Sequence, residues 1–157
     1  MKFERSELGA LFSKLRTAVP EVRAVGTNDA GILLSGSNAY ATNLELSVRA
    51  GLSKPVEQDV VVPPRGVDFI SGTVAPEISI ESEKGILTVK SGTARARLNT
   101  TPAENYPELS GPGNDARRCV VGASDLSWAI SKVIYAVAKD EKHPAHRGLC
   151  FSRKGED

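Results

Sequence analysis

Side chains of the types that can bind a metal ion or take part in catalysis lie together near the end of the chain. His143 and His146 stand three positions apart, and Asp140, Glu141 and Cys150 lie close to them in the sequence. These side chain types bind zinc, and bound zinc can activate water for hydrolysis. Their spacing matches none of the zinc motifs, in which ligands recur at fixed intervals. A metal-dependent hydrolase is therefore kept only as a third class of function, and we expect no metal ion and no cofactor.

No other set of residues predicts catalysis. The sequence has no glycine-rich loop that could cradle a phosphate and no Gly-x-Ser-x-Gly nucleophile elbow. It also lacks an acidic cluster placed to hold the two magnesium ions of polymerase or nuclease chemistry. We therefore expect a protein that is not an enzyme.

Length and composition bound the fold. With 157 residues, 40% of them hydrophobic, the chain can form one well-packed core but not two full-sized ones. No apolar run approaches the roughly 20 residues that span a bilayer, and the N-terminal residues do not resemble a secretory signal. We expect a cytoplasmic protein. Cys119 and Cys150 form no Cys-x-x-Cys pair, so we expect both to be small core residues on strands.

Two amphipathic helices are predicted, and their sequences resemble each other. The first runs over residues 6–19, with Ser6 as N-cap, and the second over residues 124–138, with Ser124 and Asp125 at its start. An offset of 118 residues pairs Ser6 with Ser124 and aligns the apolar positions of the two helices. Residues 31–35 and 148–152 also match, at an offset of 117. The chain therefore contains the start of a tandem domain repeat.

Between the helices, short alternating stretches separated by turns predict strands. The expected strands are residues 31–35, 39–43, 44–52, 58–62, 77–81, 86–90 and 94–99. The last three form an antiparallel meander, and residues 64–71 form a short helix before it. The pattern predicts an α+β domain of two βαβββ units, with helices on one side of antiparallel sheets. We expect this domain over residues 1–110, a linker over 111–116, and a truncated second domain of strand, helix and strand over 117–157.

The distribution of charge favours a nucleic-acid partner, although the net charge is only +1. Residues 8–20 and 126–139 contain no acid, and Lys14, Arg16, Lys132 and Lys139 lie off the apolar stripes. The repeated helices could line a surface that meets phosphates without reading bases. Ordinary solvated helix faces explain the same residues and stay open as the alternative.

Several segments resemble one protein family, the bacterial DNA sliding clamp, which is the β subunit of DNA polymerase III. The longest is residues 91–109, which read SGTARARLNTTPAENYPEL and are similar to the end of the family's first domain. Residues 1–3, 41–46, 61–63 and 136–141 support it. The resemblance covers the whole chain.

The resemblance implies a DNA-clamp fold and a non-catalytic processivity factor for DNA replication. In the family, two chains of three similar domains form a homodimeric ring that encircles duplex DNA, with helices lining the hole. The ring tethers the polymerase and is opened by an ATP-driven loader. With the charge pattern, it gives the expected DNA-binding residues: Lys14, Arg16, Arg23, Lys132, Lys139, Lys142 and Arg147. The implied subunit interface consists of Phe69, Ile70, Arg95, Arg97 and Leu98.

Some positions depart from the family pattern. Asn43 replaces the usual aspartate, His146 stands where the first leucine of the partner-peptide pocket is usual, and the familiar Leu-Pro-Ile-Leu is absent around residues 27–31. We therefore expect that this chain alone neither closes a normal ring nor binds clamp ligands in the usual way. The alternative function is a non-ring, clamp-like module that binds or regulates a full-length clamp.

Overall fold

The computed structural model describes residues 1–20, 31–107, 119–138 and 147–152. It divides the chain into two compact units, unit 1 (Met1–Gly111) and unit 2 (Pro112–Asp157). The expected linker at 111–116 lies outside the described residues. In unit 1 the elements are β1 (Lys2–Glu4), α1 (Arg5–Leu15), η1 (Arg16–Ala18), β2 (Ile32–Ser35), β3 (Asn38–Thr42), β4 (Ser47–Gly51), β5 (Val60–Val62), α2 (Pro64–Gly72), β6 (Glu77–Glu83), β7 (Ile86–Ser91), β8 (Ala94–Asn99) and η2 (Ala103–Asn105).

Unit 1 is the predicted pair of βαβββ units, and its two sheets exchange their first strands. One sheet has the order β1-β6-β7-β8 and the other β4-β3-β2-β5, and every neighbouring pair is antiparallel. Thus β1 begins the first half of the unit but pairs with the second, whereas β5 does the reverse. The exchange makes each half complete the other's sheet. The predicted fold class, an α+β domain of two βαβββ units, is confirmed.

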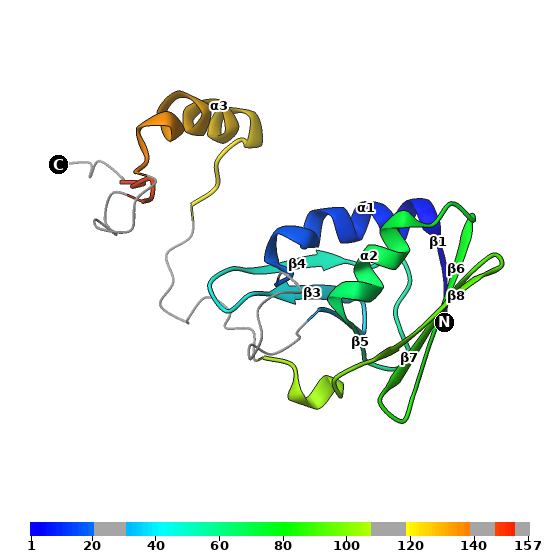
Figure 1. The fold of residues 1–157 in the computed structure, drawn as a ribbon. Coiled ribbons are helices and arrows are strands. Elements are labelled where there is room, and N and C mark those ends of the chain that lie inside the picture. The colour runs from blue at the N-terminus through cyan, green and yellow to red at the C-terminus, as the bar shows by residue number, and fades with distance from the viewer. Residues whose placement is uncertain (21–30, 108–118, 139–146, 153–157) are drawn as a thin grey trace. The chain divides into compact units, whose positions relative to one another are not determined.

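The first helix forms because its apolar side chains recur with helical spacing. Leu8, Leu11, Phe12 and Leu15 are buried, and Figure 1 shows α1 beside α2 across the sheets. The predicted cap was wrong: the N-cap is Glu4, and no side chain caps the helix there. The Arg5 amide instead donates to the Pro76 carbonyl, 2.8 Å away, because β1 leads straight into the helix. The last turn tightens into the 3₁₀ helix η1, as is common at helix ends.

The core of unit 1 lies between the two helices and the two sheets. Its largest fully buried side chains come from both halves, among them Phe12 of α1, Ile32 and Leu34 of β2, and Ile78 and Ile80 of β6. The packing is tight at the start of β2. A Cβ atom on Gly31 would lie 1.8 Å from the Val62 carbonyl oxygen. The close approach of β2 to β5 therefore requires glycine at that position.

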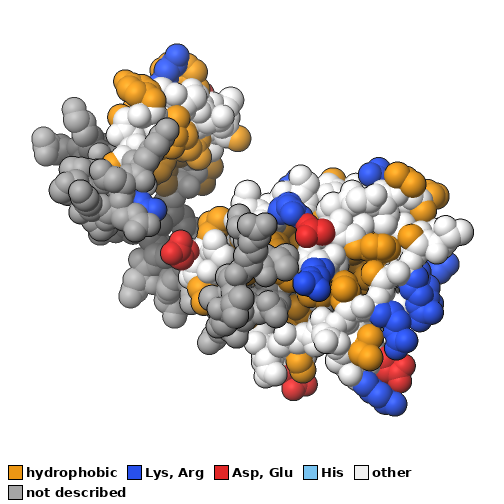
Figure 2. Space-filling view, viewed as in Figure 1, with side chains coloured by type: hydrophobic (Ala, Val, Ile, Leu, Met, Phe, Trp, Pro, Cys, Tyr) orange, Lys and Arg blue, Asp and Glu red, His pale blue; other side chains and the backbone are white. Residues whose placement is uncertain are grey.

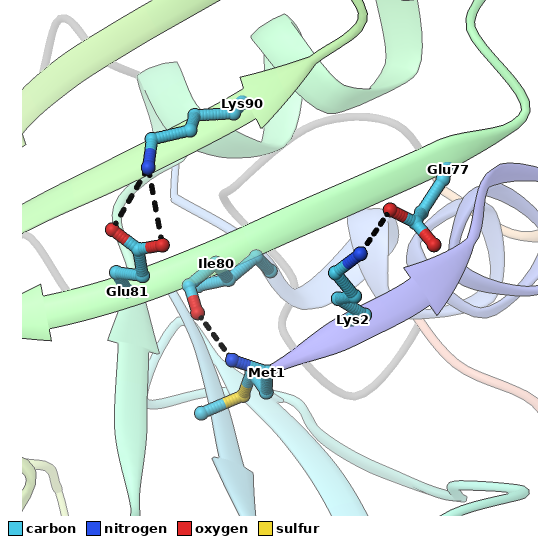
Figure 3. Close-up of polar contacts among 6 residues, drawn as sticks. All are labelled: Met1, Lys2, Glu77, Ile80, Glu81 and Lys90. Carbon is cyan, nitrogen blue, oxygen red and sulfur yellow. Dashed lines mark hydrogen bonds and ion pairs between the residues drawn. The ribbon is translucent and has the colours of Figure 1, made fainter.

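Strand β1 is fixed to β6 by main-chain and side-chain contacts (Figure 3). The Met1 ammonium donates to the Ile80 carbonyl at 2.9 Å, and Lys2 pairs with Glu77 at 2.8 Å. On the neighbouring strand the Lys90 ammonium, hydrogen-bonded to Glu81 at 3.1 Å, holds the pKa of that carboxyl below its usual value. Glu77 and Glu81 of β6 are thus each paired with a lysine on an adjacent strand.

After β8 the chain crosses from one sheet to the other as a strap, residues 100–106. The Thr100 amide donates to the Gly85 carbonyl at 2.9 Å, and its hydroxyl donates to the Val61 carbonyl. At the other end of the strap, the Tyr106 hydroxyl lies 3.1 Å from the Gly31 carbonyl oxygen and 3.2 Å from that of Tyr40. The strap therefore ties β8 and the β6–β7 turn to β2, β3 and β5.

In unit 2 the described residues form α3 (Ala123–Val133) and η3 (Ile134–Ala136). Their bounds repeat those of α1 and η1 at the predicted offset of 118 residues: Arg5 becomes Ala123 and Leu15 becomes Val133. The local pattern of the repeat is therefore present in the structure. The N-cap is Gly122 and not Ser124.

The strands expected on either side of α3 do not form in the described part of unit 2. Residues 119–122 and 147–152 have no strand pairing, and Cys119 and Cys150 are exposed. The prediction of two core cysteines on strands was wrong. The physical reason is that a strand needs a paired neighbour, and the described residues of unit 2 offer none. None of the helices in the described ranges has the length and hydropathy needed to cross a membrane.

Candidate nucleic-acid interface

The outward surface of α1 and α2 is the candidate interface. Lys14 is exposed on α1, as predicted from its position off the apolar stripe, and no ion pair in the described residues includes it. Ala10, one helical turn before Lys14, is exposed, and so are the small side chains of Ser6 and Ser13 on α1. A surface of short side chains with a projecting lysine lets a phosphate backbone approach closely. Figure 2 shows basic and acidic side chains next to each other over this part of unit 1.

Arg16 is on the same surface, but it is not a free cation. Its Nη1 atom lies 2.6 Å from Oδ1 of Asp68 on α2, and both side chains are about half exposed, 55% and 48%. Sequence reasoning missed this pair, because Asp68 is 52 residues away in the chain and belongs to the second half of the unit. The helical positions of both residues could have indicated exposure, but only the packing of α2 beside α1 brings them together.

A shallow groove of about 480 Å³ runs between the two helices. Arg5, Ser6, Gly9, Ala10, Ser13, Arg16, Asp68 and Ser71 line it. Arg5 is held at one end, where its Nε donates to the Thr73 carbonyl at 2.9 Å. The groove thus has an arginine toward each end and mostly small uncharged residues between them, and the Asp68 carboxylate that pairs with Arg16 offsets the charge of that arginine.

In unit 2, Lys132 is exposed on α3, with its ammonium 5.7 Å from the centre of the Trp128 ring. Two aromatic side chains of the same segment, Trp128 and Tyr135, are also exposed, at 66% and 85%. Arg147 is exposed, whereas Arg23, Lys139 and Lys142 lie outside the described residues.

The residues expected at a subunit interface gather around β8, an edge strand of its sheet. Arg95 and Arg97 are exposed, and Leu98 and Phe69 are partly buried. Ile70 is only 1% exposed and belongs to the core of unit 1. Its assignment to an interface was therefore wrong, because the helix turns this side chain inward, onto the sheets. A groove of about 510 Å³ between β8 and the start of α2 includes Arg65, Arg97 and Leu98.

No metal centre is present among the residues that the structure describes: they contain no group of three or more His, Cys, Asp or Glu side chains that could hold an ion. Asp140, Glu141, His143 and His146, the residues considered for such a site, lie outside the described residues.

No protein-family model matches the chain, and no curated protein matches it. Solved structures do. The chain is similar to the DNA polymerase III subunit beta from Pseudomonas aeruginosa, with 27% identity and a TM-score of 0.71 over 91% of this chain and 41% of that one. The beta subunit from Thermotoga maritima gives 28% identity and a TM-score of 0.69, over 89% of this chain and 40% of that one.

A sliding clamp from Bartonella birtlesii is more similar in fold than in sequence. Its TM-score is 0.79 at 21% identity, over 91% of this chain and 40% of that chain. The resemblance predicted from residues 91–109 is thus confirmed by structure: the chain has the fold of bacterial DNA sliding clamps. It spans about two fifths of the length of the solved clamps that it matches.

Proposed function

We propose that this chain is part of a DNA sliding clamp, a processivity factor that holds a polymerase on duplex DNA and catalyses nothing itself. The observation that carries the proposal is the pair of strand-exchanged βαβββ units, similar over 91% of the chain to a bacterial DNA polymerase III beta subunit. We also propose that the chain acts as part of a homodimeric ring in the cytoplasm, with DNA polymerase III and a clamp loader as its partners. These are proposals because the solved clamps are longer than this chain.

In this proposal the helices α1, α2 and α3 face DNA. Lys14 and Lys132 occupy repeat-equivalent positions, 118 residues apart, on α1 and α3. Neither helix has an acidic residue beyond its first turn, where acids instead favour the helix dipole. A repeated cation on a helix without nearby acids supports contact with phosphates, which carry no sequence information. Arg23, Lys139, Lys142 and Arg147 would add contacts from the loops.

The test is the salt dependence of binding to duplex DNA. In the full chain, Lys14→Glu combined with Lys132→Glu should weaken binding and flatten the plot of log Kd against log salt concentration by about 1.8, since each phosphate contact contributes about 0.9. Lys84→Glu with Lys90→Glu is the matched control, because both lysines lie on the β6–β7 hairpin and not on a helix, and the change in charge is the same. Equal effects of the two double variants would mean that the helices do not face DNA.

A second candidate function rests on the β8 edge. An edge strand with free backbone groups is a natural place for another chain to add, and exposed Arg95 and Arg97 lie on it. The chain would then be a non-ring module that binds a full-length clamp through this strand. Light scattering of the chain mixed with a bacterial sliding clamp tests this. Arg95→Glu with Arg97→Glu should abolish the complex if one forms, and a complex that survives both changes would place the contact elsewhere.

A further inference from the structure

The α1–α2 surface carries an acid at a place where a DNA-facing surface would not need one. Helix α2 contains a single acidic residue, Asp68, and α1 contains only Glu7, in its first turn. Arg5, Lys14, Arg16 and Arg65 on these segments are exposed cations. Asp68 therefore offsets one of these four positive charges.

The geometry gives Asp68 a specific target. Its Oδ1 atom lies 2.6 Å from Nη1 of Arg16, which is the length of a strong charge-assisted hydrogen bond. The pair borders the groove between the helices, where Ser13 and Ser71 leave room for an approaching phosphate. A phosphate that contacts Arg16 must compete with this carboxylate, because a paired guanidinium has little net charge to offer.

The alternative role of the ion pair is structural: it would hold α1 and the η1 turn after it against α2. Such a role would add little stability, since solvent screens most of the attraction in a half-exposed ion pair. The two helices are already held by buried residues, Leu8 and Phe12 on α1 and Val67 and Ile70 on α2. Stability alone therefore gives Asp68 no strong role.

We propose that Asp68 is an attenuating residue, which weakens the contact between Arg16 and the phosphodiester backbone of duplex DNA. The proposal rests on the proposed function, in which α1 and α2 face DNA. Each phosphate contact adds to the affinity without reading sequence, so a carboxylate that competes for one arginine lowers the affinity evenly along the duplex. A protein that must move along DNA benefits from contacts that are individually weak.

The experiment compares Asp68→Asn with Glu7→Gln in the full chain, using fluorescence anisotropy of a labelled DNA duplex at several salt concentrations. Both variants remove one negative charge from the same pair of helices, but only Asp68 pairs with Arg16 in the described structure. Asp68→Asn should tighten binding more than Glu7→Gln does and steepen the salt plot by about 0.9, one phosphate contact. The ratio of the DNA affinity of Asp68→Asn to that of the wild type should then be about threefold larger at about 50 mM salt than at about 200 mM.

A double variant separates a freed arginine from a general change in charge. If Asp68 acts through Arg16, Asp68→Asn should give no gain when Arg16→Gln is already present. A gain that persists in the double variant, or equal effects of Asp68→Asn and Glu7→Gln, would overturn the proposal. The urea midpoint of Asp68→Asn should stay close to that of the wild type, which shows that folded proteins are being compared.

The proposed function and the role of Asp68 can fail separately. If Lys14→Glu with Lys132→Glu weakens DNA binding no more than its control does, α1 and α3 do not face DNA. Both the proposed function and the attenuating role of Asp68 are then wrong. If that double variant weakens binding while Asp68→Asn behaves like Glu7→Gln, the DNA-facing surface stands and only the attenuating role of Asp68 is wrong.

Discussion

Tyr106 joins the end of the strap, residues 100–106, to the sheet that contains β2 and β3. Its hydroxyl lies within hydrogen-bonding distance of the main-chain carbonyls of Gly31 and Tyr40, which belong to the start of β2 and to β3. Burial raises the pKa of Tyr106 to about 12, because the phenolate would lose solvation there. One hydroxyl can donate one proton, so the two carbonyls share it.

Replacing Tyr106 with Phe should lower the free energy of unfolding by about 1 kcal/mol, the usual net value of one hydrogen bond. The effect should depend on pH. In the unfolded chain this tyrosine loses its proton near pH 10, but in the folded chain only near 12, so the unfolded state binds fewer protons between these values. The free energy of unfolding attributable to Tyr106 is therefore intact below about pH 10 and falls as the pH rises towards 12.

Urea unfolding of the wild type and of Tyr106→Phe at about pH 9 and about pH 11.5 measures this difference, since other titrating groups are common to both proteins. Tyr135→Phe serves as the control because that ring is exposed. The free energy of unfolding of the wild type should fall relative to that of Tyr106→Phe between the two pH values. If it does not fall, the hydroxyl is not buried in solution.

At the scale of elements, α1 and α3 show how one sequence pattern gives different energetics. Both are eleven-residue helices followed by a three-residue 3₁₀ turn, and Leu8 and Leu126 occupy equivalent positions. Leu8 is 1% exposed because the sheets cover it, whereas Leu126 is 36% exposed. The local pattern sets where the helix begins and ends, but only a covering layer turns its apolar stripe into a core.

The equivalent substitutions should therefore differ in cost. Leu8→Ala should lower the free energy of unfolding by about 2–5 kcal/mol, the range for a buried leucine that leaves a cavity. Leu126→Ala should change it by less than about 0.5 kcal/mol, as for an exposed position. Urea unfolding followed by far-ultraviolet circular dichroism gives both values. A cost for Leu126→Ala similar to that of Leu8→Ala would mean that α3 has an apolar partner in solution.

At the scale of the whole molecule, the exchange of β1 and β5 joins the two halves of unit 1. Neither sheet is complete without a strand from the other half, and core residues of both halves form one cluster. The strap, residues 100–106, adds a further connection between the sheets. Unit 1 should therefore fold and unfold as one cooperative structure, although its sequence is built from two similar βαβββ units.

Hydrogen exchange of the full chain in increasing urea tests this cooperativity. Buried amides of β2 and β7, one from each sheet, should converge on the same opening free energy and the same dependence on urea, as members of one cooperative unit do. Amides of α3 should exchange faster, because most of its side chains are exposed. Separate opening of the two sheets at different urea concentrations would contradict the cooperative exchange of strands.

Local sequence patterns were sufficient to predict most of the helices and strands of unit 1 and the class of fold. Periodic apolar residues specified α1 and the repeat in α3, and alternation with turns specified the meander of β6 to β8, because these signals depend on neighbouring residues only. The segment 91–109 indicated the clamp fold. Of the candidate site, the exposure of Lys14 and Lys132 followed from their positions off the apolar stripes of the helices, whereas Arg95 and Arg97 were indicated only by the family resemblance.

Tertiary structure alone decided which segments meet. The exchange of β1 and β5, the inward turn of Ile70, the pairing of Arg16 with Asp68 and the contacts of Tyr106 all join residues that are distant in sequence or lie on packed faces. The two cysteines illustrate the same limit, since strand-like sequence without a paired neighbour gave no strand and no core. Local pattern fixes a residue's element, whereas its burial and its partners depend on which other elements pack against it.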